Sequence, residues 1–189
     1  MIGSGAAART RATPVVAAAL AVGFALLSGC AAVEKPSAAS KVRPETCFGV
    51  FTPSELAPLL GRGDEVTVDS PYDLELNAQR RGVTCNIYVD GKTRFFATAD
   101  RLPQGQYFVW APAVDEQKPD ALPFAQNSKL WDGGAAVVLE CSGPTDAFEL
   151  RLWIDGSAEK IRQDARRPLF TELMQKYLDF AKEQTGCAG

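Results

Sequence analysis

The chain predicts one α+β domain, with a short N-terminal helix, a largely antiparallel sheet of about five strands, and a C-terminal helix packed on one sheet face. Three observations carry this prediction. Apolar and polar residues alternate over several segments, most cleanly over 148–155. Residues 169–181 instead carry an apolar stripe at helical spacing. Four cysteines follow residue 45, and an even number suits a domain held by two disulfides.

The first predicted element is a short helix over about 53–60. Thr52 and Glu55 have the spacing of a capping box, and Pro53 stands at the first helical position. Leucines then follow at helical spacing. Residues 66–68 offer a possible short strand before the period changes from helical to extended.

A β-hairpin is predicted over residues 83–99, where apolar residues alternate on both sides of an Asp-Gly pair. A two-residue turn would pair Ile87 with Arg94 and would mix charge with core on one face. A slip of one residue moves every side chain to the other face, so we predict a three-residue loop over 89–91. The predicted register pairs Cys85 with Phe95 and Val83 with Ala97, and it places Gly91 in the left-handed conformation.

Three further segments complete the predicted sheet, over 106–111, 135–141 and 148–154. The last two are joined by a turn-rich stretch of hairpin length, which makes them antiparallel neighbours. The connection over 111–133 is long for a compact domain. Such a loop is generally ordered and functional, or else flexible.

The C-terminal helix is predicted to have Pro168 in its first turn and Gly186 as its C-cap. Residues 158–167 are expected to form a preceding helical turn or a kinked extension, since a proline inside a helix removes one hydrogen bond. The apolar stripe of this helix needs a sheet face to cover, which completes the α+β arrangement.

Two disulfides are the natural use of Cys47, Cys85, Cys141 and Cys187 in an exported chain. Metal binding is the rival use, but the chain has no histidine and no Cys-x-x-Cys pair, so neither a metal nor another cofactor is predicted. Four cysteines allow three pairings. We favour Cys47 with Cys85 and Cys141 with Cys187, because each bridge would clip a terminal helix to a nearby strand.

Residues 1–29 have the pattern of a secretory signal: two arginines, an apolar run of about 14 residues, and small residues before Cys30. The tetrapeptide Leu27-Ser28-Gly29-Cys30 resembles the lipobox of bacterial lipoproteins. This resemblance implies cleavage before Cys30, attachment of diacylglycerol to its thiol, and anchoring on the extracytoplasmic face of the cell membrane. An ordinary cleaved signal or an uncleaved helix is the alternative, although about 14 residues fall short of the roughly 20 that span a bilayer.

A flexible tether is predicted over residues 30–45, which are rich in Ala, Ser, Pro and charge and show no apolar period. Its 15 residues after the lipidated cysteine would hold the domain roughly 20 Å from the lipid. The remaining residues, 46–189, suit a single domain with one core.

The charge balance argues against nucleic acid as a partner. Removal of the signal leaves 18 Lys and Arg against 23 Asp and Glu, a net charge of −5. A nucleic-acid binder should instead show a basic stripe with aromatic residues between the charges.

Common catalytic arrangements are also missing. Without histidine there is no Ser-His or Cys-His pair. Acidic neighbours such as Asp64 with Glu65, Asp115 with Glu116, or Glu149 with Asp155 could work as acid and base, but we interpret them as solvated surface residues.

The candidate interaction surface consists of Tyr88, Phe96 and Trp153, which all fall opposite the apolar phase of their strands. An exposed patch formed by the three would mark an interaction site. The alternative is that the 111–133 connection or the N-terminal helix covers them.

The layout as a whole resembles small secreted lipoproteins of high-GC Gram-positive bacteria that share a domain of unknown function. The resemblance rests on the lipobox, the low-complexity tether, Cys47 followed by Thr-Pro-Ser-Glu-Leu-Ala-Pro-Leu-Leu-Gly, the Thr84-Cys85 strand and the terminal helix. It covers residues 47–187 in outline and implies a place in the cell envelope. It implies no reaction and no functional residues.

These observations predict a non-enzymatic envelope lipoprotein, attached to the membrane through Cys30, whose domain binds an envelope protein or a cell-wall component. One alternative is a carrier of a lipid or other apolar ligand, with a cavity between the sheet and the C-terminal helix. Another is a cell-wall enzyme that works with carboxylates alone.

Overall fold

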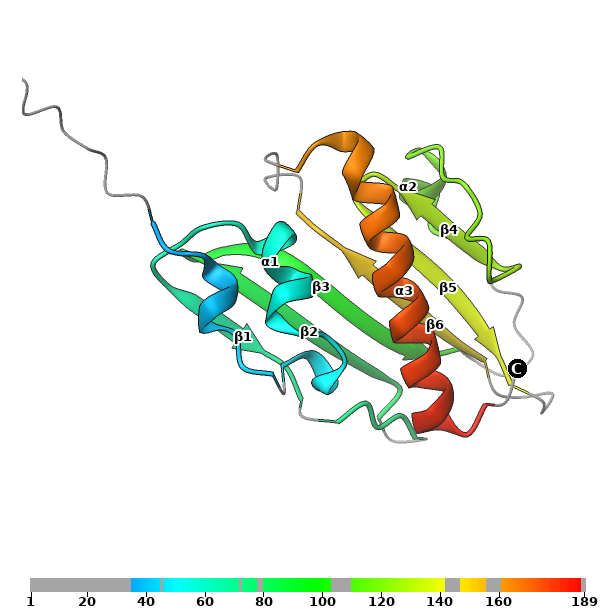
Figure 1. Ribbon diagram of the computed structural model, residues 1–189. Helices are drawn as coiled ribbons and strands as arrows, with labels where there is room; N and C mark the ends of the chain where they lie inside the picture. Colours follow the sequence, from blue (N-terminus) through cyan, green and yellow to red (C-terminus); the bar gives the residue numbers. More distant parts are fainter. Residues whose placement is uncertain are drawn as a thin grey trace, which may run out of the picture. The chain divides into compact units, whose positions relative to one another are not determined.

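The computed structural model describes residues 35–44, 46–71, 73–77, 80–102, 110–141, 147–155 and 161–187 (Figure 1). Lys35 begins its compact unit. The signal segment with Cys30 and most of the strand expected over 106–111 lie outside the described residues.

Six antiparallel strands form one sheet, in the order β1-β2-β3-β6-β5-β4. The predicted α+β class is confirmed, but the sheet has six strands where about five were expected. The strand that sequence analysis missed is β4, which lies inside the connection expected over 111–133. Its four residues, Ser-Lys-Leu-Trp, do not alternate between polar and apolar side chains. The strand bounds are Val66–Asp69 for β1, Gly82–Val89 for β2, Lys92–Arg101 for β3, Ser128–Trp131 for β4, Gly134–Glu140 for β5 and Ala147–Trp153 for β6.

The hairpin of β2 and β3 corrects the predicted register. Asp90 and Gly91 alone form the turn, both with positive φ (50° and 71°), as a two-residue type I′ turn requires. A bulge then shifts the register between Ile87 and Tyr88, so Tyr88 faces Thr93 and Ile87 faces Phe95. The bulge therefore prevents Arg94 from pairing with Ile87 on the core face, and the extra residue lies inside β3 rather than in the loop. The observed register pairs Cys85 with Ala97 and Val83 with Ala99.

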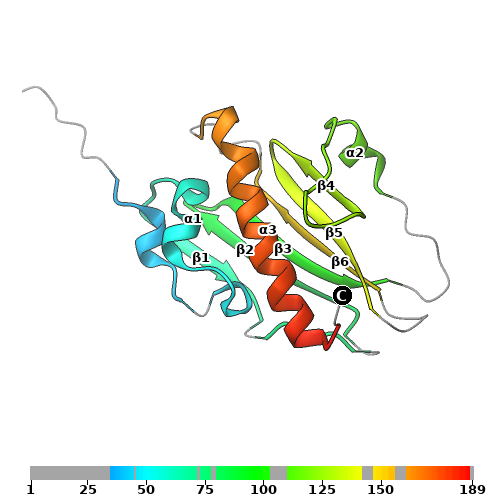
Figure 2. The ribbon, with the colours of Figure 1, turned by 45° about the vertical axis from the view of Figure 1, so that its right-hand side comes forward.

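Helices cover one face of this sheet, which we call the covered face (Figures 1 and 2). The first is α1, Pro53–Leu60, whose predicted capping box is present: the Glu55 amide donates to Thr52 Oγ1 and the Thr52 amide to Glu55 Oε2. The second is α3, which crosses the sheet diagonally. Together with the 3₁₀ helix η2 (Cys47–Gly49), they enclose the main core. Its largest fully buried side chains are Tyr177, Phe51, Phe95, Phe170, Leu56, Leu59, Leu60, Ile87, Leu150, Leu152, Met174 and Val89.

The C-terminal helix α3 is longer than its apolar stripe and runs over Gln163–Thr185. Pro168 is therefore an interior residue, with about one helical turn before it. Of the segment expected over 158–167, residues 163–167 form the start of this helix, and residues 158–160 lie outside the described part of the chain. Gly186 ends the helix in the left-handed conformation (φ 68°), as predicted.

Both disulfides of the favoured pairing are present. Cys47 is joined to Cys85, with Cα atoms 5.1 Å apart, and Cys141 to Cys187, with Cα atoms 4.8 Å apart. The first bridge fixes η2 to the centre of β2, and the second ties the end of α3 to the end of β5. The helical layer is thus bonded to the sheet at both ends of the chain.

Residues 35–44 differ from the expected tether, because they lie on the domain. We call them the strap. It contains the 3₁₀ helix η1 (Ala38–Lys41), it buries Ala38, Ala39 and Val42, and its Ala38 amide donates to the Gly61 carbonyl at 2.9 Å. The boundary of the folded unit therefore falls at Lys35 rather than at residue 46.

An ion-pair cluster fastens the start of the strap. Lys35 Nζ lies 2.6 Å from Asp90 Oδ2 and 2.8 Å from Asp64 Oδ2. Asp90 Oδ1 also accepts hydrogen bonds from the Asp64 and Glu65 amides. The bond from Lys35, followed by these amides, holds the pKa of Asp90 well below its usual range. The hairpin turn is thereby joined to the strap.

In the part of the chain that the structure describes, no helix combines the length and apolarity needed to cross a bilayer.

Candidate functional site

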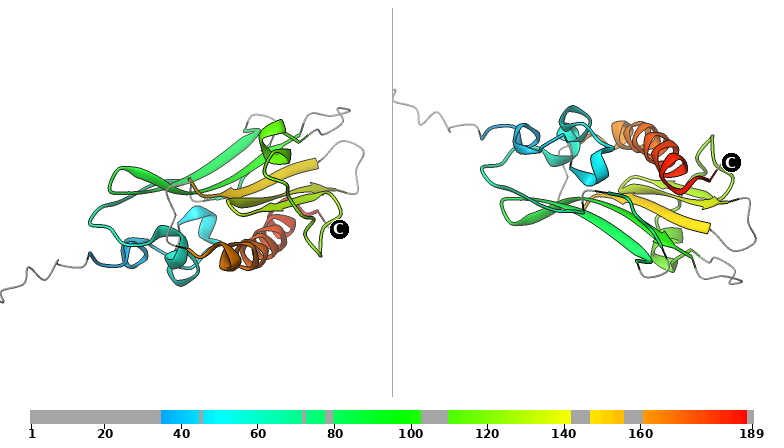
Figure 3. Two further views of the ribbon diagram at one scale, coloured as in Figure 1. Left: turned by 90° about the horizontal axis from the view of Figure 1, so that it is seen from above. Right: turned by 90° about the horizontal axis from the view of Figure 1, so that it is seen from below.

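The two faces of the sheet are covered very differently (Figure 3). The α1 and α3 helices lie on one side, whereas the single-turn helix α2 (Pro112–Asp115) lies on the other, near the β4 edge. Val114 of α2 packs there in a small apolar cluster with Trp131 and Ala136, and Trp110 and Trp153 rest against it. We call the rest of this side, over β2, β3 and β6, the open face.

Aromatic side chains cross the open face at one level of the sheet. Phe96 on β3 is the partner of Trp153 on β6, and their rings are stacked with centroids 4.5 Å apart and 8° between planes. Trp153 faces Gly134 on β5, and Gly134 faces Trp131 on β4. A Cβ atom at Gly134 would collide with the Leu152 carbonyl oxygen first and then with Trp131 and Trp153, so this glycine allows β5 to lie close to its neighbours.

From the sequence, Tyr88, Phe96 and Trp153 were candidates for one interaction surface, with coverage by the 111–133 connection or the N-terminal helix as the alternative. The structure places all three on the same side of the sheet, each partly exposed. Phe96 and Trp153 are brought into contact. Tyr88 stands further along β2, beside Thr67 of β1 and Thr93 of β3, and makes no ring contact with the stacked pair.

Charged residues flank the aromatic stack on the next two levels of the sheet. Arg151 lies beside Trp153, with its guanidinium carbon 5.8 Å from the ring centroid, and it is ion-paired with the buried Glu149. At the α2 end, Lys129 pairs with Asp115 at 3.0 Å. These charges are therefore satisfied inside the protein.

Asp100 differs from Glu149 in this respect. It is the β-sheet partner of Glu149 on one side and Gly82 on the other. Its carboxylate forms no hydrogen bond or ion pair in the described part of the chain. A Cβ atom at Gly82 would collide with Asp100 Oδ1, so the carboxylate rests over the bare backbone of this glycine.

The surroundings of Asp100 disfavour its charge. The residue is exposed on its outer side, yet partial desolvation, followed by repulsion from Glu149, raises the pKa of its carboxyl above the ordinary value of 3.8. Arg151 opposes this shift without cancelling it. A carboxylate with a raised pKa and no internal partner can gain stabilisation from an external cation.

The acidic neighbours considered from sequence do not converge as acid and base. Asp64 pairs with Lys35, Asp115 with Lys129, and Glu149 with Arg151. Within the described residues, no group of three or more His, Cys, Asp or Glu could hold a metal ion.

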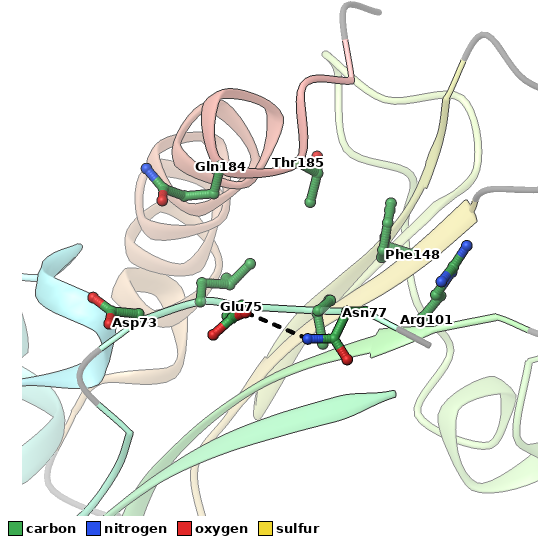
Figure 4. Close-up of a pocket in the computed structure, with 9 residues that line it drawn as sticks. Asp73, Glu75, Asn77, Arg101, Phe148, Gln184 and Thr185 are labelled. Atoms are coloured by element: carbon green, nitrogen blue, oxygen red, sulfur yellow. Dashed lines mark hydrogen bonds between the residues drawn. The ribbon is translucent and has the colours of Figure 1, made fainter. Parts of the chain in front are cut away.

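A separate pocket of about 620 Å³ lies at the C-terminal end of α3 (Figure 4). The segment 73–77 passes below the last helical turn, which contributes Gln184 and Thr185, and Phe148 and Arg101 form the far wall. Asp73, Glu75 and Asn77 make its lower rim polar. A second pocket of about 400 Å³ lies between β5 and α3, where Val137 and Leu139 face Leu178 and Lys182. Elsewhere under α3, the buried side chains of Phe170, Met174 and Tyr177 fill the space.

Sequence analysis missed Asp100 as a functional candidate, and the reason is topological. Its neighbour Glu149 comes from β6, and the two intervening strands β4 and β5 separate them along the chain. The sequence does show that Asp100 and Glu149 alternate with the apolar residues of their strands, which places each on the face opposite the core. Recognising the pair required the β3–β6 contact, which no local pattern reveals.

No protein-family model matches the chain, and neither the curated proteins nor the solved structures contain a match. The structure therefore defines a class by geometry alone: a disulfide-bonded α+β domain with one face of its sheet closed by helices and the other partly open.

Proposed function

We propose that this protein is a lipid-anchored binding module of the cell envelope, without catalytic activity, whose open face binds another protein. The observation that carries the proposal is the stacked Phe96 and Trp153 pair, partly exposed on a sheet face. The lipobox resemblance and the paired cysteines support a location outside the cytoplasm. Anchoring through Cys30 is part of the same proposal.

The composition of the open face favours a protein over a small ligand. Trp, Tyr and Arg are the side chains that most often dominate binding energy at protein interfaces. Here Trp153 and Arg151 of β6 and Tyr88 of β2 lie on the same side of the sheet, with Phe96 of β3 between these strands. Because Phe96 stacks on Trp153, one ring face of each is already occupied, which reduces the flat aromatic area available to a sugar.

Site-specific photo-crosslinking in the producing cells tests this function. A photoreactive amino acid would replace Thr84, an exposed residue of β2 on the open face. The matched control replaces Asp179, an exposed residue of α3 on the opposite side of the domain. We expect a protein adduct of defined mass from position 84 and none from position 179.

A second variant ties the adduct to the aromatic stack. Trp153→Ala should abolish the adduct from position 84 while the protein keeps its far-UV circular dichroism spectrum. Equal adducts from both positions, or an adduct that survives Trp153→Ala, would overturn the proposal. An adduct to a wall glycan would redirect it to a cell-wall component.

A further inference from the structure

We propose that the partner of the open face places a cationic side chain, lysine or arginine, against the carboxylate of Asp100. This inference rests on the proposed function and specifies the chemistry of the partner. Among the residues that the structure describes, none supplies a cation paired with Asp100, which lies four residues along β3 from Phe96 of the aromatic stack.

The charges on β3 and β6 identify the missing group. Glu149 of the open face is neutralised by Arg151. Asp100 beside it adds a negative charge that no cation of the described residues pairs with. A basic side chain of a partner restores the balance, whereas an acidic one adds a third carboxylate at the same place.

Space is available for that side chain. Gly82 contributes no side chain next to Asp100, and Thr84 on the following level is small and exposed. The aliphatic stem of a lysine or arginine can lie over these two residues of β2 while its charged end meets the carboxylate. The apolar part of the partner then reaches Phe96 and Trp153.

The position of Asp100 beside Glu149 makes its negative charge unfavourable in the absence of a partner. A lone carboxylate close to Glu149 is unfavourable in the free protein, so an amide would suit the fold better. Residues that oppose stability are common at functional sites, because binding supplies the compensation. The external cation gives Asp100 such a role.

Two dipeptide probes test the inference directly. N-acetyl-Phe-Lys-amide and N-acetyl-Phe-Gln-amide would be titrated into the 15N-labelled protein, purified in detergent from the membranes of its producing cells. The indole N–H signal of Trp153 reports binding, and a Trp153→Phe variant assigns it. We expect the lysine probe to bind about threefold more tightly at pH 7, the size of a partly exposed ion pair.

Matched variants then isolate the charge. Asp100→Asn should bring the two dissociation constants together, and Thr84→Glu should widen their ratio, while Thr84→Lys should reverse the preference. Equal binding of both probes to the unmodified protein, or a ratio that Asp100→Asn leaves unchanged, would overturn the inference. If the crosslink from position 84 still depends on Trp153 in that case, the proposed function stands and only the basic chemistry of the partner is wrong.

Discussion

Phe95 and Phe96 are neighbours on β3, and they show how different the two faces of one sheet can be. Phe95 is fully buried on the covered face. Its ring and that of Phe51 pack edge to face, with centroids 5.5 Å apart. Phe96 is partly exposed on the open face, stacked on Trp153. Burial under helices accounts for the position of Phe95, whereas Phe96 lies where no helix of the main core covers it.

Alanine substitution of the two phenylalanines should have the largest and most divergent effects. Phe95→Ala removes a buried ring from the main core and should lower the free energy of unfolding by about 3–5 kcal/mol. Phe96→Ala should lower it by about 1–2 kcal/mol, because the ring is partly solvated and loses mainly its stacking partner. Urea unfolding of both variants measures the contrast. Equal losses would show that the open face is a second core.

Removal of a disulfide should come next in size. The double variant Cys47→Ala with Cys85→Ala opens a loop of 38 residues between two fully buried positions. The free energy of unfolding should fall by about 2–4 kcal/mol. Cys141→Ala with Cys187→Ala is the matched control, with a separation of 46 residues. Crosslinking from position 84 should survive in both variants at 20 °C, because neither bridge touches the open face.

The covered face also contains a polar group without a hydrogen-bond partner, the hydroxyl group of Tyr177. This atom is buried with no hydrogen-bond partner, and burial raises the pKa of the phenol well above 10.0. Tyr177→Phe should therefore raise the free energy of unfolding by about 1 kcal/mol, since an unsatisfied polar group is removed. Thermal unfolding measures the gain, and probe binding on the open face should stay the same. A loss of stability would mean that the hydroxyl has a partner.

Asp100 should give the smallest stability effect and the clearest pH dependence. Because its folded pKa lies above the ordinary value, ionisation costs more in the folded chain than in the unfolded one. Asp100 therefore lowers stability as the pH rises through these two values. Asp100→Asn should be more stable than the unmodified protein at pH 7, and the difference should vanish below pH 3.8.

Tyr177→Phe and Asp100→Asn compare a polar group on the covered face with one on the open face. Both remove a polar group without an internal partner, and both should stabilise the domain. The change on the covered face should leave binding intact, whereas the change on the open face should weaken it. If Asp100→Asn stabilises the protein and leaves its preference for the lysine probe unchanged, then the Asp100 carboxylate, like the Tyr177 hydroxyl, lowers stability without contributing to binding.

Local patterns were sufficient for the parts of the fold that depend on neighbours in sequence. The capping box at Thr52, the glycine that ends α3, and the alternating phases of β2 and β6 all follow from residues a few positions apart. The favoured disulfide pairing is present, but the sequence alone left three pairings open, and the preference rested on joining each terminal helix to a nearby strand.

Features set by contacts across the sheet could not be predicted in this way. The bulge at Arg94 depends on the core selecting Phe95 over its neighbour, which the turn residues do not reveal. The short strand β4 exists because β5 and a bridge from Asp120 hold it on both sides. The stack of Phe96 on Trp153 and the proximity of Asp100 to Glu149 both require β3 beside β6.

The strap changes how far such a module could travel. With the proposed anchor at Cys30, four residues separate the lipid-bearing cysteine from Lys35, where the chain is already fixed to Asp64 and Asp90. Five extended steps reach at most about 17 Å. The domain would then stay within one headgroup layer or so of the bilayer and would search for its partner in two dimensions. Encounter would depend on lateral diffusion, so proteins that share the membrane would meet it far more often than proteins that only pass by.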